Sequence, residues 1–110
     1  MLKIAKSGTK MTKLEKKILS LVSQIPKGKV TTYKIIALKI GDGHLARAVG
    51  NAVPKNLNIN KIPCHRVVKS NGQFGDYLLG LAKKIKLLQN EGIKIKGDKI
   101  ADFKSYLYRF

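Results

Sequence analysis

Helix-breaking residues divide the first half of the chain into three short helical segments. The first segment starts at Thr12-Lys13-Leu14-Glu15, a capping box in which the threonine and glutamate side chains satisfy backbone donors at a helix start. Apolar residues then recur on one helical face as far as Ile25, and Pro26-Lys27-Gly28 ends the pattern because proline cannot continue the hydrogen-bond ladder. This pattern predicts a helix from Thr12 to about Ile25.

Two shorter helical segments follow and are separated by a glycine turn. Apolar residues line one side of residues 33–40, a helix that Thr31 or Thr32 can cap. Gly41-Asp42-Gly43 breaks this helix, and a third helix is predicted from about His44 to Val53. A tight turn between two short helices that follow a longer one is typical of a helix-turn-helix unit.

The rest of the chain predicts a small β-hairpin, one more helix and a terminal extension. Residues 66–69 have strand composition, and Asn71-Gly72 favours a turn that brings residues 74–77 back beside them. Residues 93–98 alternate like an edge strand, and the aromatic-rich residues 103–110 are expected to pack on the body. The helix is expected over residues 80–90, with Leu81, Ile85 and Leu88 turned inward and Lys83, Lys84 and Lys86 outward.

The charge of the chain points to a polyanionic partner. The 110 residues include 23 Lys and Arg against 6 Asp and Glu, a formal net charge of +17. Packing a core needs no such excess, whereas nucleic acid attracts it, and a hydrophobic content of 44% excludes a disordered basic tail. The patterns together predict a mainly α fold with a small β-hairpin, a winged-helix-like helix-turn-helix domain that binds DNA.

The apolar residues do not form a membrane anchor. No uninterrupted apolar stretch approaches the roughly 18 residues that a bilayer-spanning helix needs. Met1 to Lys10 alternates lysine with apolar residues and has no signal-peptide apolar region. We therefore expect no membrane contact and a cytoplasmic location.

The one cysteine, Cys64, is the residue best suited to covalent chemistry. A single cysteine excludes an internal disulfide and a multi-cysteine zinc site. It stands beside His65 and Arg66, and nearby cations lower the pKa of a thiol and so favour the nucleophilic thiolate. Pro63 restricts the backbone on both sides of it. From these residues alone, a reactive cysteine and a buried structural cysteine are equally supported.

The segment Pro63-Cys64-His65-Arg66-Val67-Val68 resembles the active-site signature of the O6-alkylguanine-DNA alkyltransferases, single-turnover proteins that repair alkylated DNA. The resemblance covers residues 12–92. It implies a basic lead-in over residues 1–11, an alkyltransferase catalytic and DNA-binding domain over 12–92, and an extension over 93–110 packed on the same domain. The further matches, in the family's order and at compatible spacings, are residues 25–33, 46–52, 75–77, 87–88 and 91–92 together with Asn56.

The resemblance implies a catalytic role for three residues at the centre of the signature. Cys64 would accept the alkyl group and expel guanine as an anion. His65 would take the thiol proton through a water, and Glu91 would orient that imidazole. Glu91 also stands out by itself, since the helix dipole disfavours a carboxylate in the last turn of a helix. Its alternative interpretation is a solvated surface glutamate.

Three further residues match positions that line or brace the family's base pocket. Tyr33 would donate a hydrogen bond to guanine N3, and Tyr77 would line the pocket and form a hydrogen bond with the base. Asn56 would brace the active-site loop. By composition alone, a core aromatic with its hydroxyl at the surface is the better supported interpretation of each tyrosine, and Asn56 fits ordinary turn chemistry.

The third predicted helix matches the family's DNA-contacting helix. Arg47 would fill the gap left when the damaged nucleotide rotates out of the duplex, although a solvated surface arginine is the ordinary alternative. Small side chains suit a helix pressed into the minor groove, and they offer little base readout, so binding is expected to be independent of sequence. The remaining residues expected to contact substrate or DNA are Ala46, Ala48, Gly50, Asn51, Arg66 and Leu78.

The chain departs from the family at two places, and three functions stay open. We expect the additional N-terminal α/β domain that most members carry to be missing, since only a dozen residues precede the first predicted helix. Leu78-Leu79 stands where the family more often has small or polar residues beside the binding tyrosine. The first expectation is irreversible transfer to Cys64 from double-stranded DNA, by a monomer that needs no cofactor or metal. The alternatives are an alkyltransferase-like sensor that binds lesions without removing them, and a winged-helix regulator. Retention of Cys64 and absence of tryptophan favour transfer, since those sensors usually carry tryptophan in place of the cysteine.

Overall fold

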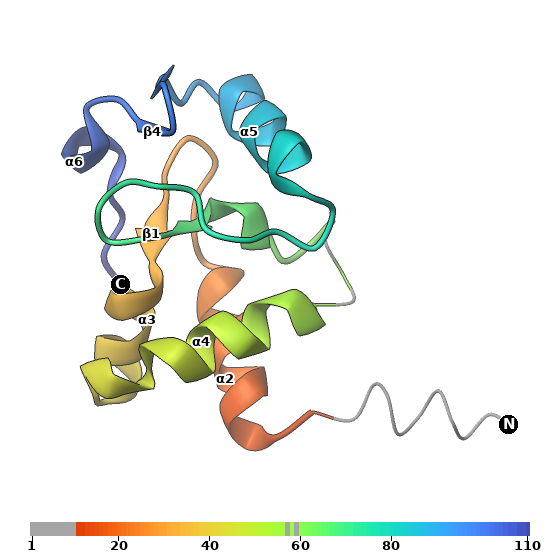
Figure 1. The fold of residues 1–110 in the computed structure, drawn as a ribbon. Helices are drawn as coiled ribbons and strands as arrows, with labels where there is room; N and C mark the ends of the chain where they lie inside the picture. The colour runs from red at the N-terminus through yellow and green to blue at the C-terminus, as the bar shows by residue number, and fades with distance from the viewer. Residues whose placement is uncertain (1–10, 57, 59) are drawn as a thin grey trace, which may run out of the picture.

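The computed structural model describes residues 11–56, 58 and 60–110 (Figure 1). The basic lead-in predicted for residues 1–11 lies, apart from Met11, outside the described residues. No helix in the described part of the chain is long and apolar enough to cross a membrane.

Helix α2 (Lys13–Val22) begins at the predicted capping box. The Thr12 hydroxyl accepts a hydrogen bond from the Glu15 amide, and the Glu15 carboxylate accepts one from the Thr12 amide, each at 3.0 Å. The helix ends at Val22, three residues before the predicted end, and Ile25 enters the core from the turn that follows. The buried face of α2 supplies much of the core under the later helices.

Helices α3 (Tyr33–Ile40) and α4 (Ala46–Ala52) form the predicted helix-turn-helix pair. Thr32 caps α3, because its hydroxyl accepts from the Ile35 amide at 3.0 Å. The third helix is shorter than predicted, since α4 is flanked by 3-10 turns over Gly43–Leu45 and Val53–Lys55. Both short helices pack on α2, and in Figure 1 the three occupy the lower half of the molecule.

The β-hairpin predicted over residues 66–77 is wrong. Strand β2 (Val67–Val68) pairs in parallel with β1 (Thr31–Thr32), which precedes α3, and residues 74–77 form no strand. The predicted turn does form, because the Lys69 amide donates to the Gln73 carbonyl at 2.9 Å. Gly75 then takes a positive φ of +72°, which turns the chain away from an extended path beside β2.

A small antiparallel hairpin lies instead near the C-terminus. Strands β3 (Ile95–Lys96) and β4 (Lys99–Ile100) pair across a two-residue loop that begins with Gly97. A single turn of helix, α6 (Phe103–Tyr106), follows. The last residues run beside β1, where the Tyr108 amide donates to the Val30 carbonyl at 2.7 Å.

Helix α5 (Leu81–Asn90) carries a buried lysine where an exposed one was predicted. Lys84 is 0% exposed and its Nζ donates to three backbone carbonyls: Val67 at 2.7 Å, Asp76 at 3.1 Å and Phe74. Burial lowers the pKa of Lys84 to about 8. The prediction failed because the spacing of apolar residues does not reveal carbonyl groups that lie far away in sequence and still need a donor.

The opposite error occurs in the first turn of α5. Leu81 was expected to face inward but is 52% exposed, because the buried stripe of the helix runs through Lys84 and Leu88, four residues apart. Leu78 and Leu79, just before the helix, are exposed as well.

Gly75 lets the turn after β2 approach the first residue of α3. A Cβ atom built on Gly75 would lie 2.8 Å from the Tyr33 hydroxyl oxygen, closer than such atoms approach in proteins. Any residue other than glycine would also be strained at this φ. The position of the Tyr33 ring therefore depends on the absence of a side chain at residue 75.

We predict that Lys84→Met lowers the free energy of unfolding by about 3 kcal/mol, because three buried carbonyls lose a charged donor. Chemical denaturation measures this loss. Lys83→Met removes the neighbouring exposed lysine and should change stability by less than about 0.5 kcal/mol. Equal effects of the two substitutions would contradict the role assigned to the buried ammonium.

We predict that Gly75→Ala destabilises the protein by about 2 kcal/mol more than Gly80→Ala. Both glycines have positive φ, but a Cβ on Gly80 meets no atom within 4 Å, so that variant reports backbone strain alone. Adding Tyr33→Phe to Gly75→Ala should restore part of the loss, since the nearest clash is with the hydroxyl. Urea denaturation of the variants tests the pair, and additive losses would argue against the contact.

Candidate active site

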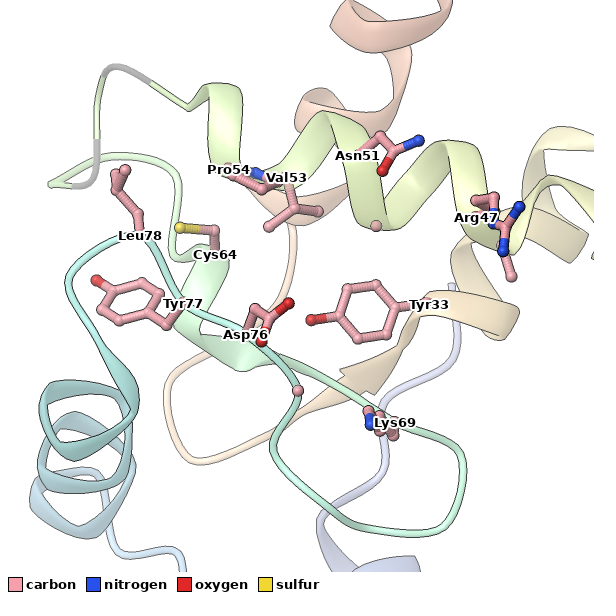
Figure 2. Close-up of a pocket in the computed structure, with 13 residues that line it drawn as sticks. Tyr33, Arg47, Asn51, Val53, Pro54, Cys64, Lys69, Asp76, Tyr77 and Leu78 are labelled. Atoms are coloured by element: carbon pink, nitrogen blue, oxygen red, sulfur yellow. The ribbon is translucent and has the colours of Figure 1, made fainter.

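A cavity of about 400 Å³ opens between α4 and the segment that leads into α5 (Figure 2). Cys64, the first residue of a 3-10 turn that continues to Arg66, lies in its wall. The predicted residues that line this cavity are Tyr33, Ala46, Arg47, Gly50, Asn51, Cys64, Tyr77 and Leu78. Five lining residues were not predicted: Val53, Pro54, Lys69, Gly75 and Asp76.

The loop before Cys64 is held by Asn56, which is 1% exposed. Its side-chain amide donates to the Ile62 carbonyl at 2.7 Å, and its carbonyl oxygen accepts from the Asn58 amide at 2.8 Å. The Cys64 amide in turn donates to the Ile62 carbonyl at 2.8 Å. These bonds fix the backbone that carries the thiol.

Cys64 is 2% exposed, and burial raises the pKa of its thiol. The Asn56 side chain and the positive charge of Lys84 act in the opposite direction but do not cancel the effect of burial. The thiol is therefore protonated at neutral pH, and nucleophilic attack requires a base that removes its proton.

His65 and Glu91 form the bonded pair that the resemblance implies. The His65 Nε2 atom lies 2.9 Å from the Glu91 carboxylate, at the end of α5. Burial lowers the pKa of His65 in spite of the attraction of Glu91. The pKa of Glu91 is also lowered: burial raises it, but hydrogen bonds from Arg66 and His65 outweigh that effect. Since an ionised carboxylate only accepts, Nε2 carries the hydrogen and neutral His65 keeps a free lone pair on Nδ1.

Arg66, expected to contact substrate or DNA, is instead bonded inside the protein. Its Nε and Nη2 donate to the two oxygens of Glu91 at 2.9 and 2.6 Å, and Nη1 donates to the Ile25 carbonyl at 2.8 Å. Such a two-pronged bond fixes the plane of the carboxylate. In this structure Arg66 holds Glu91, which in turn orients His65.

The two predicted tyrosines lie on either side of the cavity (Figure 2). Burial, with the negative charges of Asp76 and Cys64, raises the pKa of Tyr33 to about 12. Tyr33 thus keeps its proton at neutral pH and can donate a hydrogen bond. Tyr77 packs edge-on against His65 with ring centroids 6.4 Å apart, and burial also raises its pKa.

Arg47 and Asn51 are exposed on α4 beside the cavity (Figure 2). Within the described part of the chain, the Arg47 guanidinium makes no hydrogen bond or ion pair. Ala48 is partly buried and does not line the cavity. Among the described residues, no group of three His, Cys, Asp or Glu side chains is placed to hold a metal ion.

The chain is similar to known proteins of one family. Residues 13–93 match the family described as "6-O-methylguanine DNA methyltransferase, DNA binding domain". A methylated-DNA--protein-cysteine methyltransferase of Methanothermobacter thermautotrophicus is 36% identical over 86 residues, which are 78% of this chain and 48% of the relative. A bifunctional methyltransferase/endonuclease of Picrophilus torridus is 44% identical over 89 residues, 81% of this chain and 30% of that protein. The chain thus spans half or less of the length of these relatives.

A solved structure of similar size shares the fold. Schizosaccharomyces pombe Atl1, crystallised in complex with damaged DNA containing O6-carboxymethylguanine, superposes with a TM-score of 0.80 at 30% identity. The match covers 91% of this chain and 98% of Atl1. The prediction of a mainly helical helix-turn-helix domain is confirmed, and the chain belongs to the family of 6-O-methylguanine DNA methyltransferase DNA-binding domains.

Proposed function

We propose that this protein repairs DNA by transferring the alkyl group of an O6-alkylguanine irreversibly to Cys64. The observation that carries the proposal is the position of the thiol: it lies in the wall of a cavity beside α4 and is adjacent in sequence to a histidine held by a carboxylate. A buried structural cysteine would need neither the cavity nor the oriented imidazole.

The chemistry follows from the protonation states at the site. His65 takes the Cys64 proton through a water, and the sulfur electron pair forms a bond to the alkyl carbon. The bond from that carbon to O6 breaks, and its electron pair leaves with guanine. The Tyr33 hydroxyl donates to guanine N3 and stabilises the developing negative charge. A thioether has no ready reversal, so each molecule acts once and needs no cofactor or metal.

The damaged nucleotide must leave the base stack to reach this cavity, at a cost of a few kcal/mol. We propose that α4 enters the minor groove and that Arg47 occupies the vacated position. The small residues Ala46, Ala48 and Gly50 permit close approach of the helix to the duplex. Asn51 is the polar side chain of α4 available for one further contact. Binding by a monomer is then independent of sequence and depends on phosphate contacts and salt.

Lesion recognition without transfer is the second candidate function. This chain superposes on nearly the whole of Atl1, which was crystallised in complex with damaged DNA, and that match favours lesion recognition. The two functions share the cavity and the role of Arg47, and they differ in whether Cys64 reacts. Strong preference for one undamaged sequence would instead indicate a winged-helix regulator.

We predict that incubation with duplex DNA containing O6-methylguanine adds the mass of one CH2 group to the protein, measured by intact-mass spectrometry. Cys64→Ala should bind the duplex and gain no mass. Tight lesion binding by the unmodified protein without any gain would replace transfer with the sensor function.

We predict that Arg47→Ala slows transfer from duplex DNA by tenfold or more, an effect on the order of 1.4 kcal/mol, because the gap left by the rotated base stays unfilled. Reaction with free O6-methylguanine base should change little, since no gap forms there. Arg109→Ala removes an exposed arginine outside the cavity and serves as the control. Equal losses on both substrates would remove Arg47 from the proposed role.

We predict that the transfer rate falls as the pH drops through the pKa of His65 and levels off above that pKa. The folded pKa of His65 lies below its usual 6.5, and the imidazole accepts a proton only above that pKa. The rate should therefore reach half its maximum at a pH below 6.5, as measured by single-turnover kinetics. His65→Asn should be slow at every pH and lack this transition, and a midpoint above 6.5 would contradict the assignment.

A further inference from the structure

Asp76 is a carboxylate of the cavity that the proposed mechanism does not use. The chain has 6 acidic residues, and among the described contacts four of them accept hydrogen bonds through their carboxylates: Glu15, Asp42, Glu91 and Asp98. Asp102 lies outside the cavity, before α6. Asp76 lines the cavity with Cys64 and Tyr33, and its carboxylate has no hydrogen bond or ion pair to the described residues.

The backbone places Asp76 beside the Tyr33 hydroxyl. The Lys84 ammonium holds the Asp76 carbonyl at 3.1 Å, and the preceding Gly75 packs directly against the Tyr33 hydroxyl. Figure 2 shows the carboxylate and that hydroxyl pointing toward one another inside the cavity. The charge of Asp76 also contributes to the raised pKa of Tyr33, as expected for near neighbours. A hydrogen-bond donor and an acceptor thus stand side by side on one wall.

This donor and acceptor match two neighbouring atoms of guanine. N3 accepts a hydrogen bond, and the exocyclic amino group on the adjacent C2 donates two. We propose that the Asp76 carboxylate accepts a hydrogen bond from the 2-amino group of the flipped guanine while Tyr33 donates to N3. Asp76 is then the residue that selects guanine over purines without this amine, an inference that rests on the proposed function.

The charge balance of the molecule supports a binding role for this carboxylate. The DNA phosphates repel a negative side chain that lies beside bound DNA. This chain, of net charge +17, has only 6 acidic residues, and one of them lines the cavity. Asp76 is the acidic residue among those that line the cavity, and Glu91, the carboxylate that orients His65, is bonded by Arg66. A hydrogen bond to a charged acceptor is stronger than one between neutral groups.

The test compares two duplexes that differ only in the 2-amino group, one with O6-methylguanine and one with O6-methylhypoxanthine. The unmodified protein should react at least tenfold faster with O6-methylguanine. Asp76→Ala should slow that reaction about tenfold and leave the reaction with O6-methylhypoxanthine nearly unchanged, so that the preference disappears.

The control separates the hydrogen bond from the change in net charge. Asp102→Asn removes one negative charge outside the cavity, and asparagine tolerates the left-handed φ of that residue. It should alter both duplex reactions equally and keep the preference. An unchanged preference in Asp76→Ala would overturn the inference.

Failure of the proposed function gives a different result. If neither duplex adds mass to the unmodified protein, transfer is excluded, and the ratio of the two duplex affinities then decides the role of Asp76. Tighter binding of the O6-methylguanine duplex that is lost in Asp76→Ala supports the inference. Equal affinities of the unmodified protein for the two duplexes overturn it.

Discussion

The ammonium of Lys84 joins three segments that no regular hydrogen-bond ladder connects. It anchors α5 to β2 through Val67 and to the loop that carries Asp76 and Tyr77 through two further carbonyls. The turn at Gly75 can therefore remain irregular without leaving buried carbonyls unsatisfied. The wall of the cavity opposite α4 depends on this one buried charge, and so does the placement of the side chains that line it.

A second set of largely buried charged groups holds the imidazole of His65 in place. Arg66 fixes both oxygens of Glu91, and Glu91 fixes the imidazole of His65. Burial alone would raise the pKa of Glu91 and disfavour its ionised form, and the hydrogen bonds from Arg66 and His65 reverse this effect. The result is a neutral histidine of one tautomer beside a protonated thiol. This is the starting state that proton transfer from Cys64 requires.

Some features follow from residues close together in sequence. The capping box at Thr12, the threonine cap of α3 and the glycine break before α4 each involve groups within about four residues of one another. The Cys64-His65 signature is likewise contiguous, and the family resemblance extended it to Tyr33, Tyr77 and Glu91. Such local chemistry is visible without knowledge of the fold, which is why the order of helices was predicted correctly and why most of the predicted site residues lie around one cavity.

The remaining features were decided by contacts between distant parts of the chain. Strand β2 pairs with β1, 36 residues earlier, instead of with the segment that follows its turn. Lys84 is buried because carbonyls of other segments converge on it, and Arg66 turns inward because the end of α5 brings Glu91 beside it. The sequence by itself determined which helices form, and it contains one cysteine, Cys64, as the candidate nucleophile. Only the tertiary structure determined which charges are buried and which carboxylate is left free in the cavity, since both depend on groups that meet only after the chain has folded.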